Sequence, residues 1–270
     1  MTHPRIGMIG AGMMGEAMIG GLLKNGTPAA HIYAAEPRAD RRAQLHAQYG
    51  ITMVASNREA IAAVDVVVFA IKPQIISGVL TELRGHIPTG ALVLSIMAGV
   101  TIATLRDGLA HEAIVRAMPN TPAMIGAGMS GWTAVGVTDT QRGWAKAVLE
   151  SFGQAVYVDN EHYINQVTAL SGSGPGYVFL MLEALTDAGV HVGLARPLAK
   201  QLAEQTMLGS LQYAIASTKH PAELRNDVTS PAGTTAAGLV AMEKAGLRTA
   251  INDGVRAAYE RSVELGKPQH

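Results

Sequence analysis

A glycine-rich turn between a short apolar segment and a helix constrains this chain more than any other feature of its sequence. Gly10-Ala11-Gly12-Met13-Met14-Gly15 has the spacing G-x-G-x-x-G, and it directly follows the apolar segment Arg5–Ile9. Glu36 lies about 20 residues after the motif, at the end of the next apolar segment. Such glycines often serve only as a tight turn. In this context they predict a dinucleotide site, because Gly10 permits the turn and Gly12 lets the backbone approach a pyrophosphate at the N-terminus of a helix.

The first half of the chain alternates short β-branched segments with stretches that carry helix punctuation. Strands are expected at Arg5–Ile9, His31–Ala35, Ile51–Val54, Val64–Ile71, Ala91–Met97, Ala113–Met118 and Ala155–Val158. The run 66–71 is continuously apolar, as in a parallel strand covered on both faces. Asn25-Gly26 marks a helix end, and Thr138-Asp139-Thr140-Gln141 has capping-box spacing. We therefore predict an α/β fold with an N-terminal Rossmann-type, doubly wound parallel sheet.

The second half of the chain has a different sequence pattern, which predicts helices without strands. After Asn160 no further strand is expected, and 196–216 and 248–265 are long, helical and rich in Ala and Gly. Small residues let helix axes approach closely, often across a subunit contact. Ser171-Gly172-Ser173-Gly174-Pro175 lacks both a preceding strand and a P-loop lysine, so we expect a break between helices there. We place residues 1–160 in a dinucleotide-binding Rossmann domain and residues 161–270 in an all-helical domain.

The composition suits this fold and excludes several classes of function. Hydrophobic residues make up 48% of the 270 residues and aromatic residues only 4%, so the core must be built from aliphatic side chains. The formal charge is zero, without the basic footprint of a nucleic-acid-binding protein. There is no cysteine, the nine histidines lack metal-site spacing, and the apolar run 66–71 is too short to span a bilayer. Because a strand begins at Arg5, we expect no signal peptide, and a cytoplasmic protein without a metal, nucleic-acid or membrane partner.

Three segments follow predicted strands, at the sheet edge where such folds bind ligands. Lys72-Pro73 ends one strand, where the lysine either binds a ligand or caps the end of the strand. Ser95-Ile96-Met97-Ala98-Gly99 ends another in small residues, which leave space for a nicotinamide ring. In Met118-Pro119-Asn120-Thr121-Pro122, a rigid polar turn, Asn120 either orders a substrate or satisfies the turn.

The segment 227–235 gathers hydroxyl groups and small residues between two predicted helices. Its sequence is Asp227-Val228-Thr229-Ser230-Pro231-Ala232-Gly233-Thr234-Thr235. Thr234 or Thr235 is expected to cap a helix that runs through Met242. A helix N-terminus with free N–H groups and several hydroxyls is also suited to binding a carboxylate. This segment is therefore our candidate substrate site.

These segments resemble the pyrroline-5-carboxylate reductase family along essentially the whole chain. The most specific match is 228–243, and 70–73, 118–122 and 170–175 match recurring blocks of the family in the same order. The resemblance implies a Rossmann domain, then a helical domain that forms an intertwined homodimer, and dimers that often assemble into decamers. It implies reduction of 1-pyrroline-5-carboxylate to L-proline by hydride transfer from NADP(H) or NAD(H), the last step of proline biosynthesis.

Carried over position by position, the resemblance gives individual residues a role. Under the pyrophosphate, between Gly10 and Gly15, would lie Gly12, Met13 and Met14. Near the adenosine would lie Glu36 and Asn57. Along the rest of the cofactor would lie Ala70, Lys72, Pro73 and Ala98, beside Gly99. The substrate would be held by Ser230, Gly233, Thr234 and Thr235, with the Thr235 hydroxyl on the ring nitrogen as the catalytic group.

Two positions depart from the family pattern. Met13 stands where many members have Asn, so one polar contact to the cofactor would be missing. Glu36 stands where NADP-preferring members usually have a small hydroxyl or a basic residue. We therefore expect this chain to accept both NADPH and NADH.

Two other functions share part of this sequence pattern. A 3-hydroxy acid dehydrogenase has a similar plan, but it needs a catalytic lysine on the first long helix of the second domain, and 171–191 contains no lysine. A non-catalytic NAD(P)-binding regulatory protein would need only the first half. The hydroxyl-rich segment 227–235 argues against it, because a regulator has no use for a carboxylate pocket.

Overall fold

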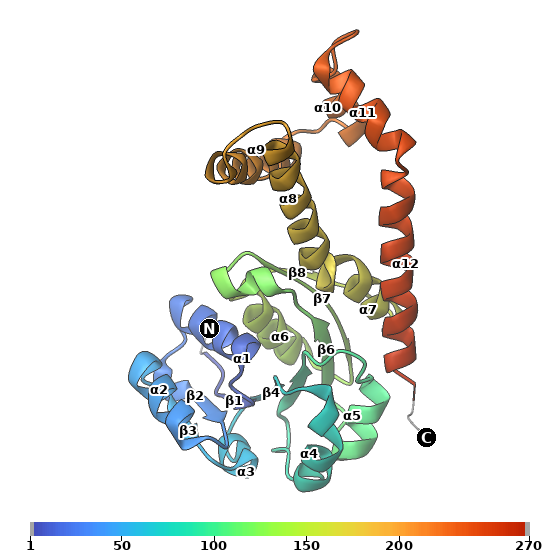
Figure 1. The fold of residues 1–270 in the computed structure, drawn as a ribbon. Helices are drawn as coiled ribbons and strands as arrows, with labels where there is room; N and C mark the ends of the chain where they lie inside the picture. Colours follow the sequence, from blue (N-terminus) through green and yellow to red (C-terminus); the bar gives the residue numbers. More distant parts are fainter. Residues whose placement is uncertain (1–2, 268–270) are drawn as a thin grey trace. The chain divides into compact units, whose positions relative to one another are not determined.

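The computed structural model describes residues 3–267, and the first half of this chain forms one eight-stranded sheet (Figure 1). The strand order is β3-β2-β1-β4-β5-β6-β7-β8. The strands are β1 Ile6–Ile9, β2 Ile32–Ala35, β3 Thr52–Val54, β4 Val66–Phe69, β5 Leu92–Ser95, β6 Ile114–Met118, β7 Gly128–Val135 and β8 Gly153–Tyr157. Strands β1 to β6 are parallel. The predicted strands are confirmed, each trimmed or shifted by a few residues at its ends.

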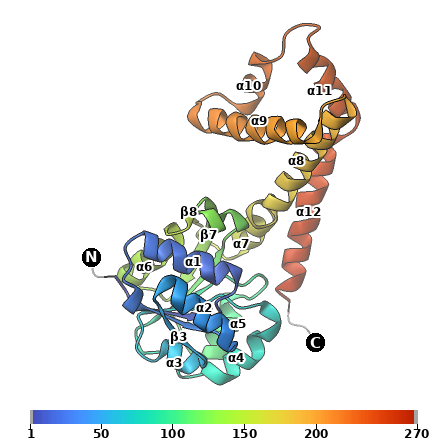
Figure 2. The same cartoon turned by 60° about the vertical axis from the view of Figure 1, so that its left-hand side comes forward.

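Helices cover both faces of the sheet, as the doubly wound prediction requires (Figure 2). They are α1 Met13–Lys24, α2 Ala39–Tyr49, α3 Asn57–Ile61, α4 Ile76–Leu83, α5 Ile102–Leu109 and α6 Asp139–Glu150. Short 3-10 segments lie at η1 Ala29–His31, η2 Pro73–Ile75 and η3 Thr121–Ile125. One core packs α1, α2 and α6 on the sheet through Met18, Leu45 and Val148. The other packs α3, α4 and α5 through Ile61, Leu80 and Leu105.

Two predicted helix boundaries are confirmed by their capping geometry. Helix α1 ends at Lys24, and the N–H of its C-cap residue Asn25 donates to carbonyls of the last turn. Helix α6 begins with the predicted capping box, in which Thr138 and Gln141 each bond the backbone of the other. The boundary residues alone were enough to predict both helix ends.

Strand β7 has no counterpart in the sequence prediction. It runs antiparallel to β6 and pairs with β8 on its other side. Its sequence mixes glycine, serine and threonine with apolar residues, so neither strict alternation nor a continuous apolar run marks it. Pairing on both edges nevertheless buries it: Ser130 is 0% exposed and Trp132 3%. The sheet is thus parallel in six strands and mixed at this side.

The second half is entirely helical among the described residues 161–267. Its helices are α7 His162–Val167, α8 Gly174–His191, α9 Arg196–Ala216, α10 Pro221–Asp227, α11 Thr234–Lys244 and α12 Leu247–Leu265. Helix α9 has the predicted bounds, and α12 begins one residue before the predicted Arg248. Within residues 3–267, no helix combines the length and the apolar character needed to cross a membrane.

The expected break between helices at Ser171–Pro175 is confirmed: it falls at Ser173, which lies in neither of the two helical segments around it. Residues Thr168–Gly172 form a π-helical turn, η4, which directly follows α7, and α8 begins at Gly174. A π-helical turn inserts an extra residue without leaving the helical path. Glycines at 172, 174 and 176 therefore accompany a wide turn rather than a loop.

Contacts divide the described chain into two units. One comprises the residues up to Ser173 together with those from Ala258 onward, and the other comprises Gly174–Ala257. The predicted boundary at residue 160 lies before α7, which packs on the sheet: the side chain of Val167 would lie 2.7 Å from a Cβ at Gly131 of β7. The last residues of α12 also belong to the first unit, where Ser262 Oγ bonds Asn165 Oδ1 at 3.0 Å.

Candidate functional site

The predicted cofactor residues gather along one edge of the first unit. In β1, β2, β4, β5 and β6 the chain leaves the sheet in the same direction, because these strands are parallel. Backbone bonds hold the exits side by side: Gly10 N donates to Ala35 O at 3.2 Å, and Ala70 N donates to Ile9 O at 2.9 Å. After β1 the chain forms β2 and β3 on one side of β1, and then β4 on its other side. This is the switch point at which open α/β sheets bind ligands.

The three motif glycines are required for three different reasons. Gly10 has φ +94°, and a Cβ there would lie 2.8 Å from Ala70 O. A Cβ at Gly15 would lie 2.6 Å from Gly10 O, so the helix packs directly on the turn. Gly12 is the N-cap of α1 with extended φ −70°, and no atom lies within 4 Å of a Cβ built on it. The space over Gly12 is therefore open to a ligand.

The two methionines of the motif differ in their surroundings. Met13 is 76% exposed in the first turn of α1. Met14 is partly buried and packs against the core beneath the sheet edge. Of the two methionines, only Met13 therefore exposes most of its side chain to a ligand.

Glu36 is a buried acid at the end of β2. It is 6% exposed, and its Oε1 accepts bonds from Arg38 N at 3.1 Å and Arg38 Nε at 3.0 Å. Its main-chain oxygen accepts a bond from Arg42 Nη1 at 2.8 Å. Asn57, at the start of α3, donates to Glu82 Oε2 at 2.8 Å. The Asn57 amide is therefore engaged within the protein, whereas Glu36 Oε2 accepts no hydrogen bond from the described residues.

The exits of β4 and β5 carry the other predicted cofactor residues. Lys72 is exposed and precedes Pro73, which begins η2. Ala98 and Gly99 are half-buried in the turn after β5. Gly99 has φ +75°, and a Cβ there would lie 3.0 Å from Cβ and O of Leu265. The end of α12 thus supports the turn from behind.

Asn120, at the exit of β6, ties three segments together. Its Nδ2 donates to Ser171 O at 3.2 Å and lies 3.3 Å from Ser171 Oγ. Its Oδ1 accepts a bond from Met129 N at 2.9 Å. The amide therefore holds η4 and the start of β7 in place.

The hydroxyl-rich segment forms the N-terminus of α11 in the second unit. The N-cap is Gly233, not a threonine, and no side chain caps the helix. Thr234 and Thr235 occupy the first two helical positions and are exposed. The first N–H groups of a helix have no intrahelical partner. Free N–H groups and two hydroxyls therefore meet at one exposed helix end.

The turn before α11 depends on a glycine. Gly233 N donates to Ser230 O at 3.0 Å, and a Cβ at Gly233 would lie 2.3 Å from Ser230 Oγ. Ser230 therefore turns its hydroxyl toward the helix start. Thr229 is used differently, because its hydroxyl donates to Arg225 O at 2.6 Å.

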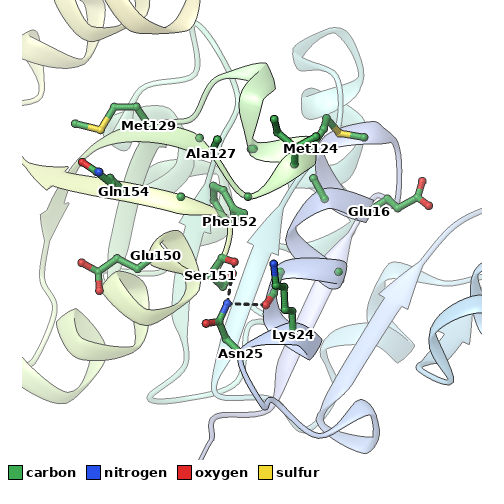
Figure 3. A pocket seen from close by; sticks show the side chains of 18 of the residues that line it. Glu16, Lys24, Asn25, Met124, Ala127, Met129, Glu150, Ser151, Phe152 and Gln154 are labelled. Atoms are coloured by element: carbon green, nitrogen blue, oxygen red, sulfur yellow. Dashed lines mark hydrogen bonds between the residues drawn. The ribbon is translucent and has the colours of Figure 1, made fainter. Parts of the chain in front are cut away.

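A cavity of about 1040 Å³ lies elsewhere in the first unit, along α1 and the segments around η3 and β8 (Figure 3). Asn25 lies on its wall and donates to Gly21 O and Ser151 O, both at 2.9 Å. Of all the residues predicted to bind cofactor or substrate, none lines this cavity. The candidate site is consequently the open sheet edge, not this hollow.

Two charged clusters beside the site were missed in the sequence. Arg116, in the middle of apolar β6, is 3% exposed and donates to Glu161 Oε1 at 2.7 Å. The same oxygen accepts a bond from Ile102 N at 2.8 Å and so caps α5. The second cluster joins Glu16 of α1 to Arg41 and Tyr49 of α2. A lone arginine inside an apolar strand was a signal for the first, whereas nothing local marks the second.

No group of three or more His, Cys, Asp or Glu side chains that could hold a metal occurs among the described residues.

Comparisons with known proteins agree with the Rossmann-type first half of the chain and with its helical second half. A family model described as pyrroline-5-carboxylate reductase dimerisation matches residues 161–265, and one described as NADP oxidoreductase, coenzyme F420-dependent, matches residues 5–99. A pyrroline-5-carboxylate reductase of Pseudomonas aeruginosa is 43% identical over 269 residues, covering 99% of this chain and 98% of the relative. One from Synechocystis is 44% identical, covering 97% and 98%.

Solved structures are similar over the same length. A pyrroline-5-carboxylate reductase from Coxiella burnetii has a TM-score of 0.92 at 35% identity, covering 98% of this chain and 99% of that one. A pyrroline carboxylate reductase from Plasmodium falciparum with NADP bound has a TM-score of 0.89 at 30% identity, covering 99% and 100%.

Proposed function

This chain belongs to the pyrroline-5-carboxylate reductase family, and from that premise we propose how its residues carry out the reaction. The chain reduces 1-pyrroline-5-carboxylate to L-proline with a hydride from NAD(P)H. The observation that carries this conclusion is likeness over the full length of the chain to relatives that bear one activity. The dehydrogenase and regulatory alternatives are therefore not retained.

We assign the cofactor to the edge of the sheet in residues 1–160. The residues fit a dinucleotide, because Gly12 leaves an open cradle at the N-terminus of α1, where free N–H groups favour a pyrophosphate. Glu36 would accept bonds from the adenosine ribose, and the small residues Ala98 and Gly99 would lie along the nicotinamide. The remaining assigned positions are Gly10, Met13, Met14, Gly15, Asn57, Ala70, Lys72 and Pro73.

We assign the substrate to the N-terminus of α11 in residues 161–270. The carboxylate would take the free N–H groups and the hydroxyls of Ser230 and Thr234, in a turn that Gly233 keeps open. Thr235 would hydrogen-bond the ring nitrogen. Asn120 has its amide engaged by Ser171 and Met129, so its part is to hold η4 and the start of β7 in place.

The reaction depends on how the imine is positioned more than on a strong acid or base. A protonated cyclic imine is already an electrophile, and bound NAD(P)H supplies the hydride. The protein must fix the carboxylate and present C5 of the imine to the hydride donor. Hydroxyls and helix N–H groups can do this, so neither a metal nor a carboxylate dyad is needed for the reaction.

The protein is a homo-oligomer through its helical half, which matches the family's dimerisation model. Large apolar side chains exposed on α8 and α9 suit such a contact, and they include Phe179, Leu180, Leu208, Leu211 and Ile215. We propose a homodimer of cytoplasmic location, with further assembly into a decamer.

The proposed reaction is tested by following absorbance at 340 nm with 1-pyrroline-5-carboxylate, separately with NADPH and NADH. We expect imine-dependent loss of absorbance and formation of proline with each cofactor. Cofactor binding without any consumption on addition of the imine would contradict the proposal.

Glu36 should set the balance between the two cofactors. Its carboxylate suits the ribose diol of NADH and repels the 2′-phosphate of NADPH, while the exposed Arg38 attracts that phosphate. Arg38 is exposed and already pairs with the buried Glu36 carboxylate, so each effect should be worth on the order of 1 kcal/mol and neither should dominate. We expect the ratio of kcat/KM for NADPH over NADH to rise about fivefold in Glu36→Ser and to fall in Arg38→Ala.

The matched control is Glu112→Ser, which removes an exposed acid just before β6, at the opposite end of the strands, and should leave the ratio unchanged. A wild-type preference for NADPH above about 100-fold would show that Glu36 does not contact the ribose.

A further inference from the structure

Three arginines follow Glu36, close to where Rossmann units distinguish NADP from NAD. Arg42 uses Nη1 to donate to the carbonyl oxygens of Glu36 and Pro37, both at 2.8 Å. Arg38 pairs with Glu36 but keeps 64% of its side chain exposed. Arg41 points the other way, toward α1. Its position is the feature that the proposed function leaves unexplained.

Arg41 is held by a carboxylate of the neighbouring helix. Its Nη2 donates to Glu16 Oε2 in the first turn of α1, and its Nη1 donates to Gln44 Oε1 at 2.8 Å. The side chains of Arg41 and Glu16 are only 16% and 21% exposed. An ion pair sheltered in this way is screened less by salt than one on the open surface, and moving one partner leaves the other charge poorly compensated.

Glu16 is fixed from a second side by Tyr49, at the end of α2. The Tyr49 hydroxyl donates to Glu16 Oε1 at 3.1 Å. Burial, and next the hydrogen bond and negative charge of Glu16, raise the pKa of Tyr49 above its ordinary value. Both carboxylate oxygens of Glu16 are thus occupied by groups of α2. Glu16 lies at the margin of the cavity of Figure 3, on the outer side of α1.

We propose that Glu16 is a positioning residue for cofactor specificity, because it withholds Arg41 from the 2′-phosphate of NADP. Arg41 lies in the first turn of α2, three residues after Arg38, so a released guanidinium has the reach to meet an anion there. With Arg41 neutralised by Glu16, only Arg38 faces the phosphate, and it does so against Glu36. The inference rests on the proposed binding of the adenosine beside Glu36.

The test is Glu16→Gln, which removes the charge but can still accept the Tyr49 hydrogen bond. We expect kcat/KM for NADPH relative to NADH to rise roughly fivefold, through a lower KM for NADPH and with kcat unchanged. Arg41→Met should leave the wild-type ratio within about twofold, because that arginine is already withheld. The double variant should return to the wild-type ratio, and Glu16→Asp, which keeps the charge, should stay near it.

A binding measurement separates this inference from the reductase assignment. Titration calorimetry with adenosine 2′,5′-bisphosphate and with 5′-AMP reports the phosphate preference without any turnover. We expect the preference for the bisphosphate to increase in Glu16→Gln and to return to the wild-type value in the double variant. Absorbance titration, with Tyr49→Phe as the reference, should show a lower Tyr49 pKa in Glu16→Gln, since the negative charge that raises it is gone.

An unchanged phosphate preference in a folded Glu16→Gln protein would overturn the role of Glu16 alone. A fall in that preference in Arg41→Met as large as in Arg38→Ala would do the same, since it would show that Arg41 already serves the phosphate. If wild-type protein binds neither nucleotide, the adenosine assignment falls together with this inference.

Discussion

Replacing Thr235 with alanine is expected to lower kcat/KM for 1-pyrroline-5-carboxylate by about 10- to 1,000-fold, the range for one well-placed hydrogen bond to the reacting group. Thr235 lies in the first turn of α11 with its side chain exposed. Within residues 3–267 its hydroxyl has no hydrogen-bond partner, so it is free for a ligand. The KM for NADPH should barely change, because the residues that we assign to the cofactor lie in the other half of the chain.

Two variants make the Thr235 result specific. Thr235→Ser keeps the hydroxyl and should recover most of the activity. Thr249→Ala removes another exposed threonine, early in α12, and should have no effect on the kinetics. Steady-state kinetics on the three proteins, with thermal melts to confirm folding, decide the matter. Near-normal activity of Thr235→Ala would remove Thr235 from the site.

Gly12→Ala is expected to weaken NADPH and NADH alike by about 100-fold in kcat/KM, while the protein remains folded. A Cβ at Gly12 meets no protein atom within 4 Å, and φ −70° is open to any residue. The added methyl group therefore costs little in the free protein. It would instead occupy the space of the pyrophosphate, and such an overlap typically costs 1–3 kcal/mol, or about 5- to 150-fold.

Gly15→Ala is the matched control for this prediction. Its Cβ would lie 2.6 Å from Gly10 O, so the substitution should lower the melting temperature by several degrees even without cofactor. Gly12→Ala should melt within roughly 3 °C of the wild type. The two measurements are NADPH binding by fluorescence and thermal unfolding by circular dichroism. Tight NADPH binding to Gly12→Ala would show that the pyrophosphate lies elsewhere.

Features that depend on neighbouring residues could be predicted from the sequence. The turn at Gly10–Gly15 was predictable because only glycine relieves its contacts, and the helix that begins after Thr138 because capping depends on residues three apart. The apolar run 66–71 predicted a central strand, since a parallel strand is covered on both faces, and residues 66–69 of it form the buried β4. The start of α11 could also be predicted, because its hydroxyl-rich segment is continuous in the sequence, although the N-cap is Gly233 rather than a threonine.

Features that depend on partners far away in the sequence became visible in the folded chain alone. Strand β7 lacks an apolar pattern and is buried because β6 and β8 pair with both its edges. The segment before the break at Ser173 is a π-helical turn, in which the Ser171 carbonyl accepts a bond from Asn120, 51 residues earlier. Arg41 is one of three arginines that follow Glu36, and only the fold brings Glu16 of α1 beside it, 25 residues away in sequence. Propensity and capping act within a few residues, whereas ion pairs and strand pairing depend on which segments the fold brings together.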